Sequence, residues 1–284
     1  MVKIILARNI GFCSGVRRAI AITEKTLALK KNRVYSLGAV IHNPGVINRL
    51  SKKGLTTVRS LDEVEDSSTL ILPSHGSPRG VIEEGRNKRL EMVDVTCPYV
   101  SSVQKICRTL HEKGDAVVII GDSGHPEIKA LRDLAPSAVV IDSAARVKEN
   151  QFAGKKVGII SQTTQSREKF FRIVSSILEK NPGGREFHVY NTICLDTSKR
   201  QEEVTKIAGE VDVLLVIGSR ISANTKRLLH LGRKANRSTF LVEHERQVPR
   251  RPLEKAKTIG IISGASAPSW LVNAVIKKIK ELRN

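Results

Sequence analysis

Three of the four cysteines occupy similar positions in the sequence. Cys13, in GFCSGV, and Cys97, in TCPYV, each follow a predicted strand and come just before a predicted helix, and Cys194, in NTICLD, resembles them. Backbone amides and the helix dipole at such a position favour the thiolate, which is the reactive and metal-binding form. Cys107 differs because it lies on the apolar face of its predicted helix, which indicates packing.

The spacing of these cysteines leaves their chemistry open. A structural zinc site normally shows Cys-x-x-Cys pairs, and the sequence has none. The closely spaced cysteine run of ferredoxins is absent as well. A catalytic zinc ion, an iron–sulfur cluster held by three cysteines, and a chance arrangement are all compatible with the spacing.

Polar residues also follow most of the predicted strands. In open parallel sheets, ligands bind outside the carboxyl ends of the strands, so this pattern predicts a shared polar pocket. A serine or asparagine after a strand is also a common helix N-cap, and a histidine in a turn is often merely solvated. The candidate site residues at these strand ends are His42, His75, His125, Glu127, Thr163, Ser222, Asn224 and Ser266.

The elements that would position these residues are short apolar strands alternating with amphipathic helices. Near-continuous Val, Ile and Leu runs are typical of strands covered on both faces, as in parallel sheets. Apolar residues at helical spacing predict helices over 14–30 and 99–113, and RQVPRRP at 246–252 reads as a surface loop. We therefore expect an α/β fold built from similar subdomains. The predicted strands are KIILA, RVYSL, TLILP, MVDV, AVVIIG, AVVID, KVGIIS, EFHVY, DVLLVIG, STFLVE and TIGIIS.

Composition narrows the class of protein. The 284 residues carry a net charge of +20, spread along the chain, which suits nucleic acid, phosphorylated substrates or acidic protein partners. Only 4% of the residues are aromatic, which disfavours a base-stacking surface. No run of about 18 apolar residues predicts a membrane span, and the N-terminus does not resemble a signal peptide. Four cysteines without an export signal favour a reducing, cytoplasmic location.

Nine motifs, in register along essentially the whole chain, resemble one enzyme family. They are GFCSGVRRAI, IHNPGVINRL, SHG, DVTCPYV, GHPE, SQTT, NTIC followed by RQEEV, SANTKRL, and GASAPSW. Together they are similar to the hydroxymethylbutenyl diphosphate reductases (IspH/LytB) of the non-mevalonate isoprenoid pathway. Each motif alone is a weak signal, and their shared order makes the resemblance specific.

The resemblance implies a trefoil of three α/β domains around a central [4Fe–4S] cluster. The domains would be 14–96, 97–193, and 194–284 together with the N-terminal strand in 1–13. Cys13, Cys97 and Cys194 match the family's ligands and would each bind one iron. The fourth iron would then be free of protein ligands and open to substrate, where it could act as a Lewis acid.

The family's substrate is (E)-4-hydroxy-3-methylbut-2-enyl diphosphate, and its products are isopentenyl and dimethylallyl diphosphate. The resemblance implies that Glu127 delivers protons and that Thr163 lies near the substrate alcohol. Breaking a C–O bond at neutral pH requires protonation of the leaving group, so a carboxyl group there is sensible. By the same resemblance, the substrate-binding residues are His42, His75, His125, Thr163, Ser222, Asn224 and Ser266.

The sequence departs from the family pattern at three places. Ala223 stands where a second serine is usual, which would cost about 1–3 kcal/mol if a phosphate oxygen were left unpaired. Pro73 replaces the typical Arg before SHG, and Leu195-Asp196-Thr197 replaces the common Ala-Thr after the third cysteine.

Other functions stay open at this point. A divergent paralogue would act on another phosphorylated substrate, a basic nucleic-acid-binding protein would use the net charge, and a zinc-dependent hydrolase would use the thiolates. The positive charge also fits an acidic electron donor such as ferredoxin or flavodoxin.

Overall fold

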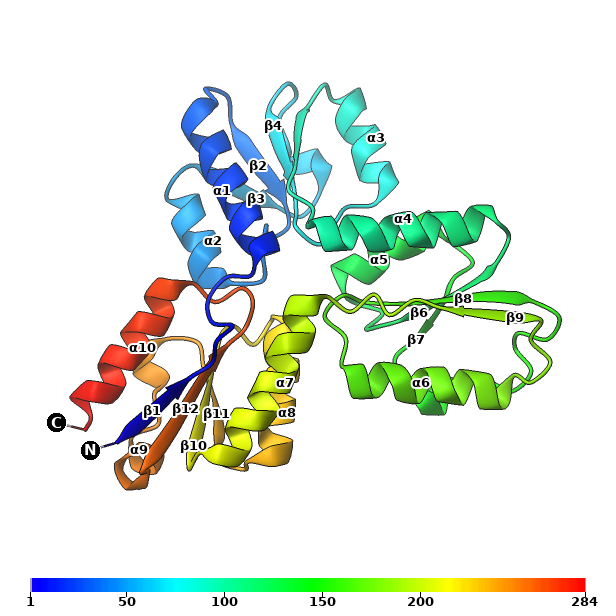
Figure 1. Cartoon of the computed structure of the whole chain (residues 1–284). Coiled ribbons are helices and arrows are strands. Elements are labelled where there is room, and N and C mark those ends of the chain that lie inside the picture. The colour runs from blue at the N-terminus through cyan, green and yellow to red at the C-terminus, as the bar shows by residue number, and fades with distance from the viewer. Residues whose placement is uncertain (1, 284) are drawn as a thin grey trace. The chain divides into compact units, whose positions relative to one another are not determined.

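The strands form three parallel sheets of four strands each within residues 2–283, which the computed structural model describes (Figure 1). This confirms the α/β class expected from the alternating pattern. The chain divides into two compact units. The first comprises the N-terminal 17 residues, residues 41–50 and the part from residue 195 onward, and the second comprises residues 18–40 and 51–194.

The sheet of the first unit has the strand order β1-β12-β10-β11. Its central strand shows why the apolar runs are continuous. Leu215 of β10 packs in one core with residues of α9 and α10, and its neighbour Leu214 packs in another core with residues of α7 and α8. Both faces of the sheet are therefore covered. The elements are β1 (Lys3–Leu6), β10 (Val213–Ile217), β11 (Thr239–Val242), β12 (Thr258–Ser263), α2 (Pro44–Ser51), α7 (Leu195–Glu210), α8 (Ala223–Ala235), α9 (Arg250–Lys255) and α10 (Ser269–Glu281).

The N-terminal strand completes this sheet. β1 pairs in parallel with β12, with Leu6 opposite Ile261. The family resemblance implies that the N-terminal strand joins the domain at 194–284, which includes β12. The loop that follows β1 and leads to Cys13 therefore starts beside the loop that follows β12. The boundaries of three separate domains stay a prediction.

One sheet of the second unit has the order β3-β2-β4-β5. Its apolar core joins strand residues such as Tyr35 and Leu70 with Leu61 and Leu90, and side chains of α3 pack against it. The elements here are β2 (Val34–Leu37), β3 (Leu55–Val58), β4 (Thr69–Leu72), β5 (Glu91–Asp94) and α3 (Arg79–Asn87), and α1 (Ser14–Leu29) precedes them.

The third sheet has the order β7-β6-β8-β9. β6 alternates between two cores, with Val118 packing with residues of α6 and Ile119 with residues of α4 and α5. Cys107 is fully buried in the latter core, as its apolar helix face predicted, and burial raises the pKa of its thiol to about 11. The elements are β6 (Ala116–Ile120), β7 (Val139–Ile141), β8 (Lys156–Ser161), β9 (Glu186–Val189), α4 (Pro98–Glu112), α5 (Pro126–Leu134) and α6 (Arg167–Lys180).

Two local expectations from the sequence were incomplete. Strand β3 was not predicted because it is an edge strand whose two central threonines are exposed, so it lacks an apolar run. The expected loop at 246–252 contains the start of α9, which is held in place because Leu253 is fully buried in the core of the first unit. Among the helices of residues 2–283, none combines the length and apolar character needed to cross a bilayer.

Two glycines of the first unit provide a matched test of packing, because one is in close contact with its surroundings and the other is not. A Cβ added at Gly264, just after β12, would lie 2.1 Å from Thr225 Oγ1, whereas a Cβ at Gly209 of α7 would meet nothing within 4 Å. We expect Gly264→Ala to lower the free energy of unfolding by about 1–3 kcal/mol through overpacking. Gly209→Ala should raise it by about 0.5–1 kcal/mol because glycine is unfavourable inside a helix. Urea unfolding measures both, and equal stability of the two variants would contradict the packing.

Candidate functional site

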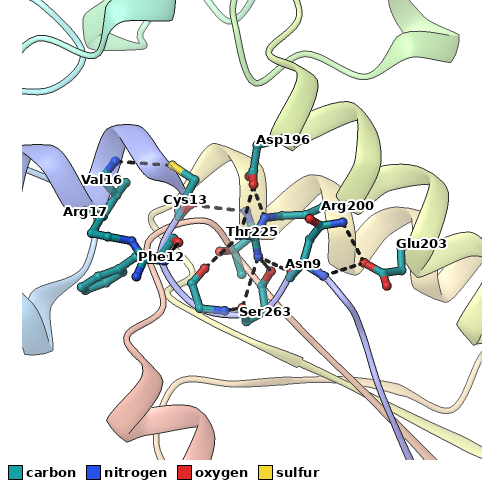
Figure 2. Close-up of polar contacts among 12 residues, drawn as sticks. Asn9, Phe12, Cys13, Val16, Arg17, Asp196, Arg200, Glu203, Thr225 and Ser263 are labelled. Atoms are coloured by element: carbon teal, nitrogen blue, oxygen red, sulfur yellow. Dashed lines mark hydrogen bonds and ion pairs between the residues drawn. The ribbon is translucent and has the colours of Figure 1, made fainter.

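In the first unit, Cys13 lies at the start of α1 and is fixed by backbone hydrogen bonds (Figure 2). Its N–H donates to the carbonyl of Ala265 at 3.0 Å, and its carbonyl accepts from the N–H of Arg17 at 2.9 Å. The N–H of Val16 points at its Sγ at 3.4 Å. The thiol is half-buried and is not part of a disulfide. An amide directed at a sulfur is the kind of contact that favours a thiolate, and the thiolate form of Cys13 stays a prediction.

Two candidate residues lie at the N-terminus of α8, just after β10. Ser222 is the N-cap, and its Oγ accepts from the N–H of Thr225 at 3.3 Å. Asn224 is only 3% exposed, yet neither its amide nitrogen nor its amide oxygen has a hydrogen-bond partner among the described residues. A buried amide without partners is costly, so this one fits a ligand that supplies both.

The loop after β12 links the remaining candidates of this unit. Ser266 Oγ donates to the carbonyl of His42 at 3.3 Å, and Asn43 Nδ2 donates to the carbonyl of Ser266 at 2.8 Å. Burial, and secondarily the positive charge of Lys226, lower the pKa of His42. Lys226 lies in the first turn of α8, where its N–H donates to the carbonyl of Ser222. The helix N-terminus and this lysine together make the surroundings of His42 favourable for an anion.

In the second unit, Glu127 and Thr163 form the most direct side-chain contact among the candidates. The Glu127 carboxylate is 2% exposed and accepts two hydrogen bonds from Thr163, one from its N–H at 2.7 Å and one from its hydroxyl at 2.8 Å. The carbonyl of Thr163 in turn accepts from the N–H of Cys194 at 2.9 Å. An acid, a hydroxyl and a thiol-bearing residue are thus linked in one chain of contacts.

His125 is the N-cap of α5, the helix that carries Glu127. Its Nδ1 accepts from the N–H of Glu127 at 3.2 Å. An accepting Nδ1 assigns the ring proton of neutral His125 to Nε2, which leaves that nitrogen as a donor. The short loop therefore places an imidazole donor and a carboxylate two residues apart at one helix start.

Cys97 and His75 follow two neighbouring strands, β5 and β4. Cys97 is the N-cap of α4, with Pro98 at the first helical position, and its N–H donates to the carbonyl of Ser74 at 2.9 Å. The next residue, His75, is half-buried, and Gly76 after it has a positive φ of +84°. A residue with a side chain rarely adopts that conformation, so the SHG motif needs its glycine for the turn.

The structure divides the sequence-predicted residues between the two units. The first holds Cys13, His42, Ser222, Asn224 and Ser266, and the second holds His75, Cys97, His125, Glu127, Thr163 and Cys194. Within residues 2–283, no three His, Cys, Asp or Glu side chains are grouped in a way that could hold a metal ion. The thiols themselves fit the iron of a cluster by their chemistry, since all three are half-buried, lie outside any disulfide and are placed at helix starts.

Sequence reasoning missed two polar residues that organise the first unit. Asn43 is buried, and its Oδ1 accepts from the N–H of Val46 while its Nδ2 holds the loop of Ser266. Arg200 is buried in α7 and bonds to the loop before Cys13. Both lie in motifs noted in the sequence, IHNP and RQEEV. A polar residue just before a helix-opening proline is the only signal that could have indicated Asn43, and nothing indicated the partners of Arg200.

A sequence profile described as LytB protein matches residues 4–280. The chain belongs to the LytB protein family. Relatives named 4-hydroxy-3-methylbut-2-enyl diphosphate reductase include one from Geobacter metallireducens, 38% identical over 99% of this chain and 98% of its own length. Another, from Aquifex aeolicus, is 37% identical over 99% of this chain and 97% of its own.

Two solved LytB-type structures share the fold. The E-1-hydroxy-2-methyl-but-2-enyl-4-diphosphate reductase from Plasmodium falciparum matches with a TM-score of 0.92 and 28% identity, over 97% of this chain and 87% of that one. A structure of (E)-4-hydroxy-3-methyl-but-2-enyl diphosphate reductase, described as the terminal enzyme of the non-mevalonate pathway, matches with a TM-score of 0.73 and 36% identity. It covers 99% of this chain and 100% of its own. The three-sheet α/β architecture is therefore that of the LytB proteins.

Because the pKa of His42 is lowered, the stability of this folded chain should depend on pH in a specific way. Between that lowered pKa and the ordinary value of about 6.5, the unfolded chain binds a proton that the folded chain does not, so stability falls as the pH drops through this window. We compare the free energy of unfolding at a pH just above this window with that at a pH well below it. The decrease between the two should be smaller in His42→Gln than in the wild type. Lys226→Gln should show an intermediate loss, because one of the two causes of the shift is gone.

Urea unfolding at a series of pH values measures this difference, and all other histidines contribute equally to wild type and variant. Identical pH dependence of the wild type and His42→Gln would refute the assignment.

Proposed function

We propose that this LytB protein removes the hydroxyl group of (E)-4-hydroxy-3-methylbut-2-enyl diphosphate reductively. Each substrate molecule takes up two electrons and two protons, loses one water, and becomes isopentenyl or dimethylallyl diphosphate. Full-length relatives that carry the name of this reductase support the proposal. The assignment of Glu127 and Thr163 as the proton donors is supported by one observation, their buried hydrogen-bonded contact. The carbonyl of Thr163 also accepts a hydrogen bond from the N–H of Cys194.

The cofactor that fits the thiols is a [4Fe–4S] cluster held by Cys13, Cys97 and Cys194, with one iron free of protein ligands. When bound, such a cluster supplies the two electrons and a Lewis acid for the leaving oxygen. Three thiols in place of four suit this role because a fully ligated cluster has no iron to offer a substrate. The chemistry of the donor set supports the assignment, since each thiol lies outside any disulfide and at a helix start.

The diphosphate group calls for several convergent donors, and the first unit carries them. Ser222 and Asn224 lie at the N-terminus of α8, with the unpartnered amide of Asn224 as the clearest opening for a ligand. His42 and Ser266 are joined by a hydrogen bond. Helix N-termini and hydroxyl or amide donors are the usual elements of phosphate sites. Ala223 supplies no hydroxyl, so the remaining donors bind the anion. His75 and His125 are proposed to contact the substrate from the second unit.

Glu127 and Thr163 are proposed to deliver the proton to the leaving hydroxyl. When Glu127 is ionised, the Thr163 hydroxyl donates to its Oε2, as in the structure. When Glu127 is protonated, the carboxylic acid donates to Thr163 Oγ1 instead, and the hydroxyl hydrogen turns toward the substrate. The oxygen then leaves as water, which is a far better leaving group than hydroxide. Burial of Glu127 keeps bulk water out of this exchange.

Electrons are proposed to come from an acidic carrier protein such as ferredoxin or flavodoxin. A net charge of +20 attracts a negatively charged partner and raises the rate of encounter. None of the four cysteines is part of a disulfide in the structure, which fits the proposed reducing, cytoplasmic location. An anaerobic assay with the hydroxylated diphosphate and a chemical reductant tests the activity directly, and absence of both products would overturn the proposal.

The first test of the cofactor is Cys13→Ser with Cys107→Ala as its matched control. After anaerobic reconstitution, the wild type should be brown and contain iron and acid-labile sulfide. Cys13→Ser should lose most of this absorbance because it removes a thiolate ligand. Cys107→Ala should keep it, since Cys107 is buried in a core. A wild type that binds zinc and contains no sulfide would favour the hydrolase alternative.

The second test is Glu127→Gln, which keeps the shape of the side chain and cannot supply the proton. We expect the cluster absorbance to be retained and turnover to fall by about 10²–10⁴-fold, the usual contribution of a general acid. An exposed carboxylate, Glu149, provides the control as Glu149→Gln, with wild-type turnover expected. Steady-state rates under saturating substrate measure both, and normal turnover of Glu127→Gln would exclude the proton relay.

A further inference from the structure

Arg200 is a buried side chain of the first unit that makes several hydrogen bonds at once. The residue is 1% exposed and lies on α7. Its Nε donates to the Asp196 carboxylate at 2.7 Å, and its Nη2 approaches the second oxygen of that carboxylate at 3.4 Å. The buried positive charge is thereby compensated by a fork of two contacts one helical turn away. The rest of the guanidinium is turned toward the loop before Cys13 (Figure 2).

Backbone carbonyls of the loop accept hydrogen bonds from the two terminal nitrogens of Arg200. Nη1 donates to the carbonyl of Asn9 at 2.6 Å, and Nη2 donates to the carbonyl of Gly11 at 2.9 Å. Nη1 also donates to the carbonyl of Ser263, the last residue of β12, at 2.9 Å. Ser263 Oγ accepts from the N–H of Gly11 at 2.8 Å. One planar group thus holds the segment before Cys13 to the end of β12.

A second charged residue of α7, Glu203, binds the backbone N–H groups of the same loop. The Glu203 carboxylate accepts from the N–H of Asn9 at 3.1 Å and from the N–H of Arg8. The loop carbonyls therefore bind the arginine, and the loop amides bind the glutamate one turn further along. A loop held through alternating backbone groups has little freedom to move relative to the helix. Gly11, with a φ of +81°, supplies the turn that brings the chain back into α1.

We propose that Arg200 is a positioning residue that fixes the backbone before Cys13 against α7, so that the Cys13 thiol is set for its cluster before the cluster binds. Cys194 directly precedes α7 in the chain. The same helix therefore begins next to one proposed ligand and binds the loop that leads to another, Cys13. The inference rests on the proposed function only for the role of Cys13 as a ligand. The immobilisation of the thiol itself is a property of the cluster-free protein.

The test uses Arg200→Met, which keeps most of the side-chain volume and removes every donor. Cluster-free protein is treated with iodoacetamide, and mass spectrometry gives the alkylation rates of Cys13 and Cys97 in the same sample. We expect the ratio of the Cys13 rate to the Cys97 rate to rise by about tenfold, the factor for one lost hydrogen bond to a charged group. Cys97 is the internal reference because its N–H is held by Ser74 in the second unit.

Asn236→Ala is the matched control for a merely structural effect. Asn236 also anchors backbone in the first unit, since its Nδ2 donates to the carbonyls of Ala208 and Val211 at the end of α7. Its loss should lower thermal stability and leave the alkylation ratio unchanged. An unchanged ratio in Arg200→Met, or an equal rise in Asn236→Ala, would overturn the proposal.

If Arg200→Met does not fold, Asp196→Asn decides instead, because it removes the charged partner that orients the guanidinium and so weakens the hold of Arg200 on the loop carbonyls. A raised ratio in Asp196→Asn supports the proposal, and a wild-type ratio overturns it. Reconstituted Arg200→Met should also lose iron to a chelator about tenfold faster than the wild type. Failure of the wild type to take up iron and sulfide would count against the proposed function alone, since the alkylation ratio needs no cluster.

Discussion

Parallel strand pairing is the constraint on which the candidate site depends. Every pairing between the strands of the three sheets is parallel, so all four strands of a sheet end at the same edge. In the first unit, this brings the loops after β1, β10 and β12 to one edge although they lie far apart along the chain. Each loop then leads into a helix whose free N–H groups face the same region. Residues far apart in sequence thereby gather at one edge of the sheet.

The two units provide different chemical surroundings at these edges. In the first, the N-terminus of α8, the side chain of Asn224 and the charge of Lys226 favour a bound anion. In the second, the buried carboxylate of Glu127 and the hydroxyl of Thr163 are suited to holding and passing a proton. Recognition of charge and transfer of protons conflict in one small pocket, because a nearby cation holds a carboxylate in its ionised form. Placing the two proposed tasks on separate chain segments would avoid that conflict.

Much of this arrangement follows from the sequence because its causes are local. Apolar runs such as DVLLVIG form strands covered on both faces, and Cys97 followed by Pro98 indicates a helix start. The edge strand β3 was missed because exposed Thr56 and Thr57 interrupt its apolar pattern. The start of α9 was missed because its formation depends on a core position for Leu253 that only the tertiary structure provides.

The candidate site could be predicted as a set of residues but not as a set of contacts. Thr163 and Glu127 each follow a different strand, and only the pairing of β6 with β8 brings them together. The loop carbonyls that Arg200 binds belong to Asn9 and Gly11, at the opposite end of the chain. Every residue has a backbone carbonyl, so the residue types in a sequence do not indicate which carbonyl a side chain will bind. Such contacts are visible only once the fold is known.

The pairing of β1 with β12 also sets an order of events during synthesis. Among the strands of the described residues, β1 comes first in chain order and its partner β12 comes last. Until Thr258–Ser263 has emerged, the loop before Cys13 has neither β12 beside it nor the Ser263 contacts that fix it. A unit that must join segments so distant in sequence folds late and slowly. Any metal delivered to that thiol in its native setting therefore meets a chain that has already been extended past Ser263.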